Sequence, residues 1–223
     1  MHPLDNPFFA SLAGAHRAFA IAAGDVLRYP ADIAPFLGAA TPGATTAEAL
    51  EAVFAPGESL HLLGEPVHVP AGWTLAPQGA LHQMLAPDVV PAGDVPGLVE
   101  LGEPHRADVL ALTALVYPHY FRDHTMALGR YFGLYEGGRL AAMIGERLAP
   151  PGHREISAVC THPDHLGRGH AARLMTWLAH DIQQGGQLPF LHVSPANTRA
   201  LALYERLGYR TRTMIPFWTL SRA

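Results

Sequence analysis

Apolar and polar residues alternate most clearly in the second part of the chain. The alternation predicts six strands, at Leu98–Leu101, Tyr131–Tyr135, Leu140–Leu148, Ile156–Thr161, Phe190–Val193 and Tyr209–Leu220. Apolar residues recur every three to four positions in three further segments, which we predict to be helices: Glu103–Leu115, Arg168 to the Gly185-Gly186 pair, and Asn197–Leu207. This order of elements predicts a mixed, mostly antiparallel sheet flanked by helices, in the α/β (α+β) class.

The first part of the chain is richer in proline and is less clearly patterned. It predicts a helix over Pro7–Ala23, a short helix that begins near Thr45 and ends at Val53, and strands at Ser59–Gly64 and Gly79–Leu85. Residues 86–97 have the composition of a linker. We therefore expect a smaller N-terminal α/β domain of unclear role over residues 1–95 and a second domain over residues 98–223.

Composition excludes several classes of function. All 15 basic residues are arginine, so phosphate-loop NTPases and Schiff-base enzymes, which need a lysine, are excluded. The single cysteine, Cys160, excludes a disulfide framework and a thiolate zinc site. The net charge of −4 argues against nucleic acid or a membrane as the main partner. The apolar stretch over residues 8–23 is interrupted by polar residues, so we expect no signal peptide and a cytoplasmic protein.

The charges are unevenly distributed. Residues 1–99 hold two arginines and nine acidic residues, a net charge of −7, whereas residues 100–223 hold thirteen arginines and ten acidic residues, a net charge of +3. The arginine-rich second part suits an anionic ligand.

Two segments of this second part carry candidate chemistry. In residues 159–172 a buried strand leads into a turn with Gly167 and Gly169, and a helix begins directly after it, which is typical of a backbone anion site that would suit a pyrophosphate. A tight structural connection would have the same pattern. Asn197 and Tyr204 lie seven residues apart, on one face of the next helix. Asn197 could cap that helix or bond a ligand, and Tyr204 could carry a proton or be a core residue.

Together these segments resemble the GNAT superfamily of acetyl-CoA-dependent N-acetyltransferases. The glycine and small-residue positions of the family's first motif correspond to Gly169 and Ala171, while Leu166 stands where arginine or glutamine is usual. The family's second motif is matched by Asn197, Ala200, Leu203, Tyr204, Gly208 and Tyr209. The resemblance covers residues 98–223, and the first domain could then be a degenerate GNAT-like half that walls the substrate cleft.

The resemblance implies a cofactor site between two parallel strands, Ile156–Thr161 and Phe190–Val193, that splay apart. Backbone groups of three residues would pair with the pantetheine arm of acetyl-CoA: Val159, Cys160 and Thr161. The pyrophosphate would lie on the amides of the turn and helix start: Gly167, Arg168, Gly169, His170, Ala171 and Ala172. The side chains of Arg168 and Arg173 would be free to add positive charge, and Asn197 and Tyr204 would complete the site.

The implied reaction is transfer of an acetyl group to a primary amine of a small molecule or protein by direct attack. Tyr204 would protonate the departing CoA thiolate. We favour His192 over Glu155 as the base for the amine, with ordered water as a further option. Cys160 is expected to be a core residue. His162, His165 and His170 crowd the phosphate-binding turn, but their spacing fits no usual ligand pattern and we expect no metal.

A different function stays open at this point. The chain could be a catalytically weak module that senses acyl-CoA and transmits that state to a partner. For an enzyme, the net charge of −7 in the first region would favour a cationic acceptor such as a polyamine, through electrostatic steering.

Overall fold

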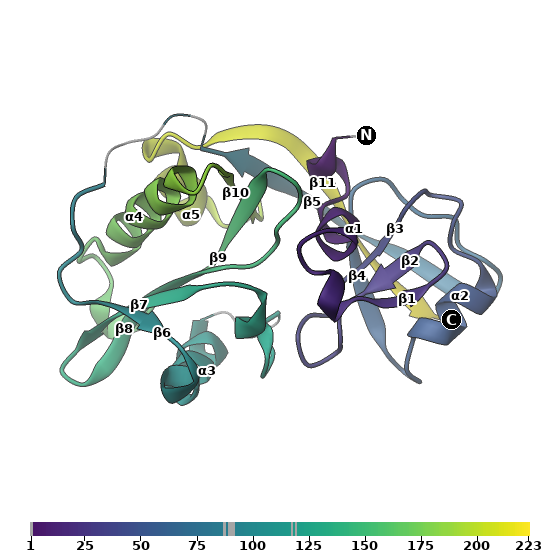
Figure 1. The fold of residues 1–223 in the computed structure, drawn as a ribbon, viewed down its shortest axis with the longest axis horizontal. Helices are drawn as coiled ribbons and strands as arrows, with labels where there is room; N and C mark the ends of the chain where they lie inside the picture. Colours follow the sequence, from purple (N-terminus) through teal and green to yellow (C-terminus); the bar gives the residue numbers. More distant parts are fainter. Residues whose placement is uncertain (1, 87, 89–91, 117, 119) are drawn as a thin grey trace.

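A computed structural model describes residues 2–86, 88, 92–116, 118 and 120–223 (Figure 1). The main sheet has eight strands in the order β4-β11-β5-β10-β9-β8-β7-β6. Their bounds, in that order, are Ser59–Leu63, Arg210–Arg222, Trp73–Leu85, Leu188–Val193, His153–Thr161, Arg139–Glu146, Tyr131–Glu136 and Leu98–Leu101. All neighbouring strands are antiparallel except β9 and β10. The predicted mixed, mostly antiparallel sheet is confirmed.

Helices cover both faces of the β7–β9 part of this sheet. α3 (Arg106–Val116) packs in a cluster with Met143 of β8, whereas α4 (His170–Gln184) packs in a cluster with Ile144. Since successive residues of a strand point to opposite faces, the two helices lie on opposite sides of the sheet, as Figure 1 also shows. α5 (Thr198–Arg206) follows β10. None of the helices in the described parts of the chain combines the length and the apolar character that a bilayer crossing requires.

The first 95 residues contribute a smaller antiparallel sheet ordered β1-β2-β3, together with β4 and β5 of the main sheet. The remaining elements of this region are β1 (Ile21–Ala23), β2 (Val26–Arg28), β3 (Leu37–Ala39), α1 (Pro7–Ala13) and α2 (Ala47–Val53). α1 packs against β2 and β3, so its apolar face supports both sheets.

The predicted helix over Pro7–Ala23 is wrong beyond Ala13. Gly14 ends α1, its amide bonding the Ser11 carbonyl, and the chain turns through a short 3-10 segment into strand β1. The alanine-rich run Ala20–Ala23 has too few residues to distinguish a helix from a strand by periodicity. Its pairing with β2 makes this segment a strand.

The predicted strand over Gly79–Leu85 is too short. β5 in fact begins at Trp73. Pro77 pairs with Trp218 of β11, while β10 reaches only the segment His82–Leu85 on the other side. A proline is accommodated there because that part of β5 has a strand neighbour on one side.

Strand β11 links the two regions of the chain. It pairs with β5 and β4, so strands from both sides of the predicted boundary share one sheet, and the division into domains 1–95 and 98–223 stays a prediction. Three arginines of β11 form ion pairs with acidic residues of the first region: Arg210 with Asp88, Arg212 with Asp5 and Arg222 with Glu51. Part of the uneven arginine distribution therefore serves to join the regions, and this role was not expected from the sequence.

Candidate functional site

The parallel strands β9 and β10 separate along their length. Their pairing covers Leu188–Phe190 opposite His153–Glu155, so the later residues of β9, 156–161, present a backbone edge that β10 does not cover. Ala158 has a φ of +50°, in the left-handed region, and the pairing with β8 shifts register beside it. This is a β-bulge, which turns backbone groups of β9 out of the regular ladder.

A cavity of about 800 Å³ opens between the separated strands. Its lining includes all eleven residues predicted to contact the cofactor: Val159, Cys160, Thr161, Gly167, Arg168, Gly169, His170, Ala171, Ala172, Asn197 and Tyr204. His192, the favoured base, also lines it, whereas Glu155 does not. The volume is in the range typical of small-molecule sites.

One end of this cavity is formed by β9, the turn after it and the start of α4. We call it the cofactor end, because the sequence predicts that the cofactor binds there. Gly167 and Gly169 have φ values of +79° and +77°, and an added Cβ would meet no atom within 4 Å at either position. These glycines are therefore required by the backbone conformation rather than by lack of space. Gly169 is the N-cap of α4 and provides no side-chain acceptor, so the first amides of the helix remain available to an anion.

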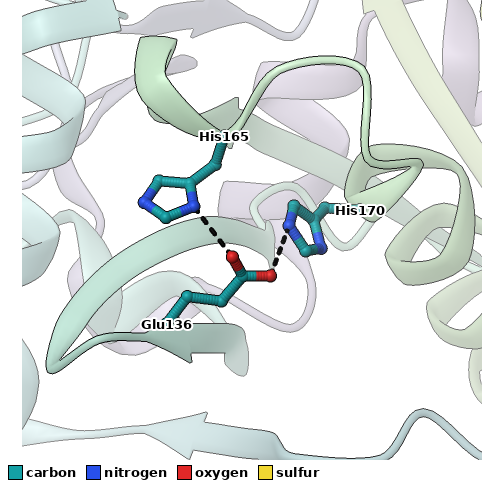
Figure 2. Close-up of side chains that lie close together, drawn as sticks. All are labelled: Glu136, His165 and His170. Carbon is teal, nitrogen blue, oxygen red and sulfur yellow. Dashed lines mark hydrogen bonds and ion pairs between the residues drawn. The ribbon is translucent and has the colours of Figure 1, made fainter.

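Glu136, the last residue of β7, holds this turn in place (Figure 2). Its carboxylate accepts from Nδ1 of His165 at 2.9 Å, lies 3.0 Å from Nε2 of His170, and pairs with Arg168. A hydrogen bond from His165, with the nearby Arg168 charge, lowers the pKa of Glu136. Arg168 is thus engaged, and Arg173 donates to Nδ1 of His170 at 2.8 Å. The expectation that both arginines are free is wrong, and Arg173 does not line the cavity.

Three side chains place atoms that could bind a metal ion within 4.8 Å of one another: Glu136, His165 and His170. His162 lies outside this group. The group does not fit a metal ion well. The Arg168 and Arg173 guanidiniums bond directly to two of its members. Because Arg173 donates to Nδ1 of His170, the ring proton lies on Nε2, the atom that would have to bind the ion. We derive no metal chemistry from this cluster.

Helix α5 turns both of its candidate residues toward the cavity. Oδ1 of Asn197 accepts from the Ala200 amide at 3.1 Å, so Asn197 caps the helix and lines the cavity at once. Tyr204 is 8% exposed, and its ring lies 6.0 Å from that of Tyr209. The sequence left open whether these two residues cap and pack or face a ligand. In the structure Asn197 caps the helix, the Tyr204 ring lies beside that of Tyr209, and both residues line the cavity.

Glu155 and His192 form one buried unit with Arg147. The Glu155 carboxylate receives two bonds from Arg147, at 2.7 and 2.8 Å, and one from Nδ1 of His192 at 2.7 Å. Burial alone would raise the pKa of Glu155, but the Arg147 charge and the hydrogen bonds from Arg147 and His192 outweigh it and hold that pKa well below its usual value. Glu155 is therefore an ionised group that orients His192.

The other ring nitrogen of His192 also has a partner. Gln83 donates from Nε2 to Nε2 of His192 at 3.1 Å and to the Leu4 carbonyl at 2.8 Å. Arg212 donates to the Gln83 Oε1 atom at 2.8 Å, which fixes the orientation of the amide. With Nδ1 donating to Glu155, His192 is in the tautomer whose Nε2 lone pair points away from the carboxylate.

Cys160 is 3% exposed in the cluster that α3 forms with the sheet. Burial raises the pKa of its thiol to about 12, so it stays protonated at neutral pH. A neutral, packed thiol is a poor nucleophile, which agrees with the expected role as a core residue.

The other end of the cavity was missed by sequence reasoning. We call it the acceptor end, after the role that we propose for it. It is lined by apolar and aromatic side chains: Phe8, Phe36, Leu63, Leu81, Tyr120 and Phe217. These residues lie far apart in the sequence and share no motif. Two cavity-lining arginines, Arg199 and Arg206, were also missed, although their spacing of seven residues on α5 places them on one helix face.

Comparison with known proteins gives matches of two kinds. Residues 131–218 match the family described as FR47-like protein. A protein of the GNAT acetyltransferase family from Novosphingobium aromaticivorans is 37% identical, with each chain covered over 100% of its length and a TM-score of 0.88. Comparison with curated proteins gives no sequence match.

More distant structures share the fold. A GCN5-related N-acetyltransferase from Kribbella flavida is 20% identical, covers 96% of this chain and 95% of its own, and has a TM-score of 0.59. An acetyltransferase of the GNAT family from Colwellia psychrerythraea is 14% identical, covers 66% of this chain and 57% of its own, and has a TM-score of 0.53. The separated strand pair and the bulged β9 thus occur in a fold that these proteins have in common.

Proposed function

Since the chain belongs to the GNAT family of N-acetyltransferases, we propose that it transfers an acetyl group from acetyl-CoA to a primary amine, with the reaction taking place in the cavity between β9 and β10. The observation that carries this proposal is the coincidence of three features on one cavity: an uncovered strand edge, an uncapped helix start and a tyrosine on the facing helix.

The lining fits the chemistry of acetyl-CoA. The uncovered edge of β9 offers backbone groups to the pantetheine amides, as an added strand would. The amides at the start of α4 and the guanidiniums of Arg168, Arg199 and Arg206 offer a positive environment to the phosphates. The bulge at Ala158 supports a role for a β9 amide in stabilising the oxyanion of the tetrahedral intermediate.

Two proton transfers accompany the reaction. A nitrogen–carbon bond forms as the amine attacks the thioester carbonyl, and the carbon–sulfur bond then breaks. Tyr204 is the proposed acid that protonates the departing thiolate, supported by its place on the cavity wall.

His192 is the proposed base for the amine, and Glu155 is its positioning residue. This assignment is supported by the exclusion of Glu155 from the cavity lining and by its hydrogen bond to Nδ1. To accept the amine proton, Nε2 of His192 would exchange its 3.1 Å bond from Gln83 for one from the amine or an intervening water.

Two measurements on the purified protein test the proposal. Acetyl-CoA should raise the melting temperature, and a panel of primary amines should release CoA thiol. Tyr204→Phe should lower kcat by about a hundredfold or more while acetyl-CoA still stabilises the fold. Tyr209→Phe is the matched control, because the Tyr209 hydroxyl is buried without a hydrogen-bond partner in the described structure and lies outside the cavity lining. This control should leave kcat unchanged.

The same experiments distinguish the base and the competing function. His192→Gln should remove the acid limb of the pH–rate profile, and a profile that keeps this limb would exclude His192 as the base. Saturable acetyl-CoA binding with no turnover of any amine would favour the alternative, an acyl-CoA sensor. If neither acetyl-CoA nor a longer acyl-CoA stabilises the fold, the proposed function is wrong.

A further inference from the structure

We propose that the amine accepted in this cavity carries a single positive charge and an apolar, preferably aromatic, body that lies in the acceptor end. This inference rests on the proposed function and adds to it the chemical class of the acceptor. It differs from the expectation of a polycationic substrate that the charge of the first region suggested.

The acceptor end is built on the part of the sheet beyond β10. Leu63 of β4 and Phe217 of β11 are direct neighbours in the strand register. Leu81 of β5 pairs with Ile215 of the same strand β11, two residues from Phe217. This face therefore continues from the separated strands onto a surface made mostly of apolar side chains, with Gln78 of β5 as a polar member of the lining.

Aromatic rings close the acceptor end. The rings of Phe8 and Phe36 are stacked with their centres 4.3 Å apart, and Tyr120 meets Phe217 edge to face at 6.3 Å. The guanidinium of Arg147 lies 5.2 Å from the centre of the Phe36 ring while it bonds to Glu155. Flat apolar walls of this kind bind an aliphatic chain or an aromatic ring through burial of apolar surface and ring stacking.

The lining offers no partner to a second ammonium group. Among the residues described as lining the cavity there is no aspartate or glutamate. Three of its arginines, Arg168, Arg199 and Arg206, are those proposed to face the phosphates of acetyl-CoA, and the charge of Arg147 is compensated by Glu155. One ammonium group must lose its proton before it attacks, so it reacts as a neutral amine. Any further ammonium group would stay charged with no carboxylate of the lining to pair with, which is unfavourable in a confined site.

None of the nine acidic residues of the first region is among the described residues that line the cavity. Five of them form ion pairs outside it: Asp5 with Arg212, Asp32 with His124, Glu51 with Arg222, Glu58 with Arg28 and Asp88 with Arg210. The net charge of −7 therefore does not act on a ligand in the cavity as an unpaired negative wall. Glu155 also lies behind the lining, where Arg147 and His192 compensate its charge.

A comparison of three amines in the CoA-release assay tests the inference. Pentylamine and cadaverine have the same carbon chain and differ by one ammonium group, while phenethylamine replaces part of the chain with a ring. We expect kcat/KM to be at least about tenfold higher for phenethylamine and for pentylamine than for cadaverine. Equal or faster turnover of cadaverine, or of spermidine, would overturn the acceptor class and leave the proposed acetyl transfer intact.

A variant with a new carboxylate at the acceptor end gives the matched test. Leu81→Glu should raise kcat/KM for cadaverine relative to phenethylamine by at least about tenfold, because the new carboxylate supplies the missing partner. Met214→Glu is the control, since Met214 is exposed on β11 and lies outside the cavity lining, and the preference should not change. If both variants keep the wild-type preference, the acceptor does not lie at this end and the inference fails.

A second variant, at Phe217, tests the same wall of the cavity if Leu81→Glu does not fold. Phe217→Leu should raise KM for phenethylamine several-fold while KM for acetyl-CoA stays unchanged, because only the acceptor wall is altered. An unchanged KM for phenethylamine would count against the inference. Stabilisation by acetyl-CoA with no turnover of either apolar amine would overturn it as well, whereas absence of any acyl-CoA binding would show that the proposed function itself has failed.

Discussion

The two ends of the cavity are built in different ways. The cofactor end consists largely of backbone: the uncovered edge of β9, two glycines with positive φ, and the uncapped start of α4, all within residues 156–172. The acceptor end consists of side chains that come from six separate parts of the sequence. A site built from backbone groups depends on a short, contiguous sequence pattern. The ligand specificity of a site built from side chains can instead change through single substitutions.

The pair formed by Arg147 and Glu155 lies where the two ends meet. Arg147 follows β8 and lines the cavity, and Glu155 is the last residue of β9 that pairs with β10 before the strands separate. The ion pair is buried, with 12% of the Arg147 side chain and none of the Glu155 side chain exposed. Its loss should therefore affect both ends, whereas changes within one end should not affect the other.

Replacing this arginine gives the largest expected effect. Arg147→Ala leaves the Glu155 carboxylate buried without its main partner, which should lower the free energy of unfolding by about 3 to 5 kcal/mol in urea denaturation at pH 7. With the arginine gone, burial loses its largest opposing contribution, so we expect the pKa of Glu155 to rise even though the hydrogen bond from His192 remains. The loss should then be smaller at pH 5 than at pH 7, because protonation removes the buried charge.

The control for this variant is an exposed ion pair of the same kind. Arg222 pairs with Glu51 at 3.1 Å, with 68% and 52% of the two side chains exposed. Arg222→Ala should cost less than about 1 kcal/mol, with little dependence on pH between 5 and 7. Equal losses in the two variants would contradict the view that burial of the Arg147–Glu155 pair gives it its importance.

The contrast between the two ends also explains what the sequence could predict. Strand alternation and the helical spacing of apolar residues are local signals, and they were enough for the fold class and for most elements of residues 98–223. That Gly167, Gly169, Asn197 and Tyr204 line one cavity was predictable, because these residues lie in short motifs with fixed spacing. The pairing of β11 with β4 and β5, which joins both regions, is a long-range contact with no such signature.

The acceptor end could not be predicted for the same physical reason. Phe8, Leu63 and Phe217 meet only after three distant segments have packed, and each has the ordinary pattern of a core residue when considered alone. The role of Arg168 was mistaken because its partner, Glu136, lies on a distant strand. The Arg173–His170 bond is an i,i+3 pair within α4 that the helix spacing could have indicated. Net charge alone does not reveal such pairing, since it also counts acidic residues that the fold pairs with arginines.

A second prediction concerns the packing behind the acceptor end. His16 is 4% exposed, and its Nδ1 atom lies 2.9 Å from the hydroxyl of Tyr29, whose ring meets Phe36 edge to face. Burial, reinforced by the charge of Arg154, lowers the pKa of His16 from 6.5 to about 4. Below pH 6.5 the unfolded chain therefore binds a proton that the folded chain does not, and stability should fall as the pH drops towards 4.

The size of this effect follows from the shift in pKa. At 1.36 kcal/mol for each pH unit, the contribution of His16 approaches about 3 kcal/mol near pH 4 and is absent at pH 7. His16→Gln should flatten the decline in the free energy of unfolding between pH 6.5 and 4.5, measured by urea denaturation. An identical decline in wild type and variant would show that the histidine is not held neutral in the fold.

The smallest expected effect is also the one that separates the two ends most cleanly. Gly169, at the start of α4, and Gly152, just before β9, have φ values of +77° and +73°, and an added Cβ meets no atom within 4 Å at either position. Alanine at either position should therefore cost a similar amount of stability, about 1 kcal/mol, from the left-handed backbone alone.

Only Gly169→Ala alters the amides of the cofactor end, so only this variant should weaken acetyl-CoA binding, by about five- to tenfold in a calorimetric titration. The ratio of phenethylamine to cadaverine turnover should stay the same in both variants, because neither change reaches the acceptor end. A shift of that ratio in Gly169→Ala would mean that the backbone site and the side-chain site are coupled, and that the two ends are one unit.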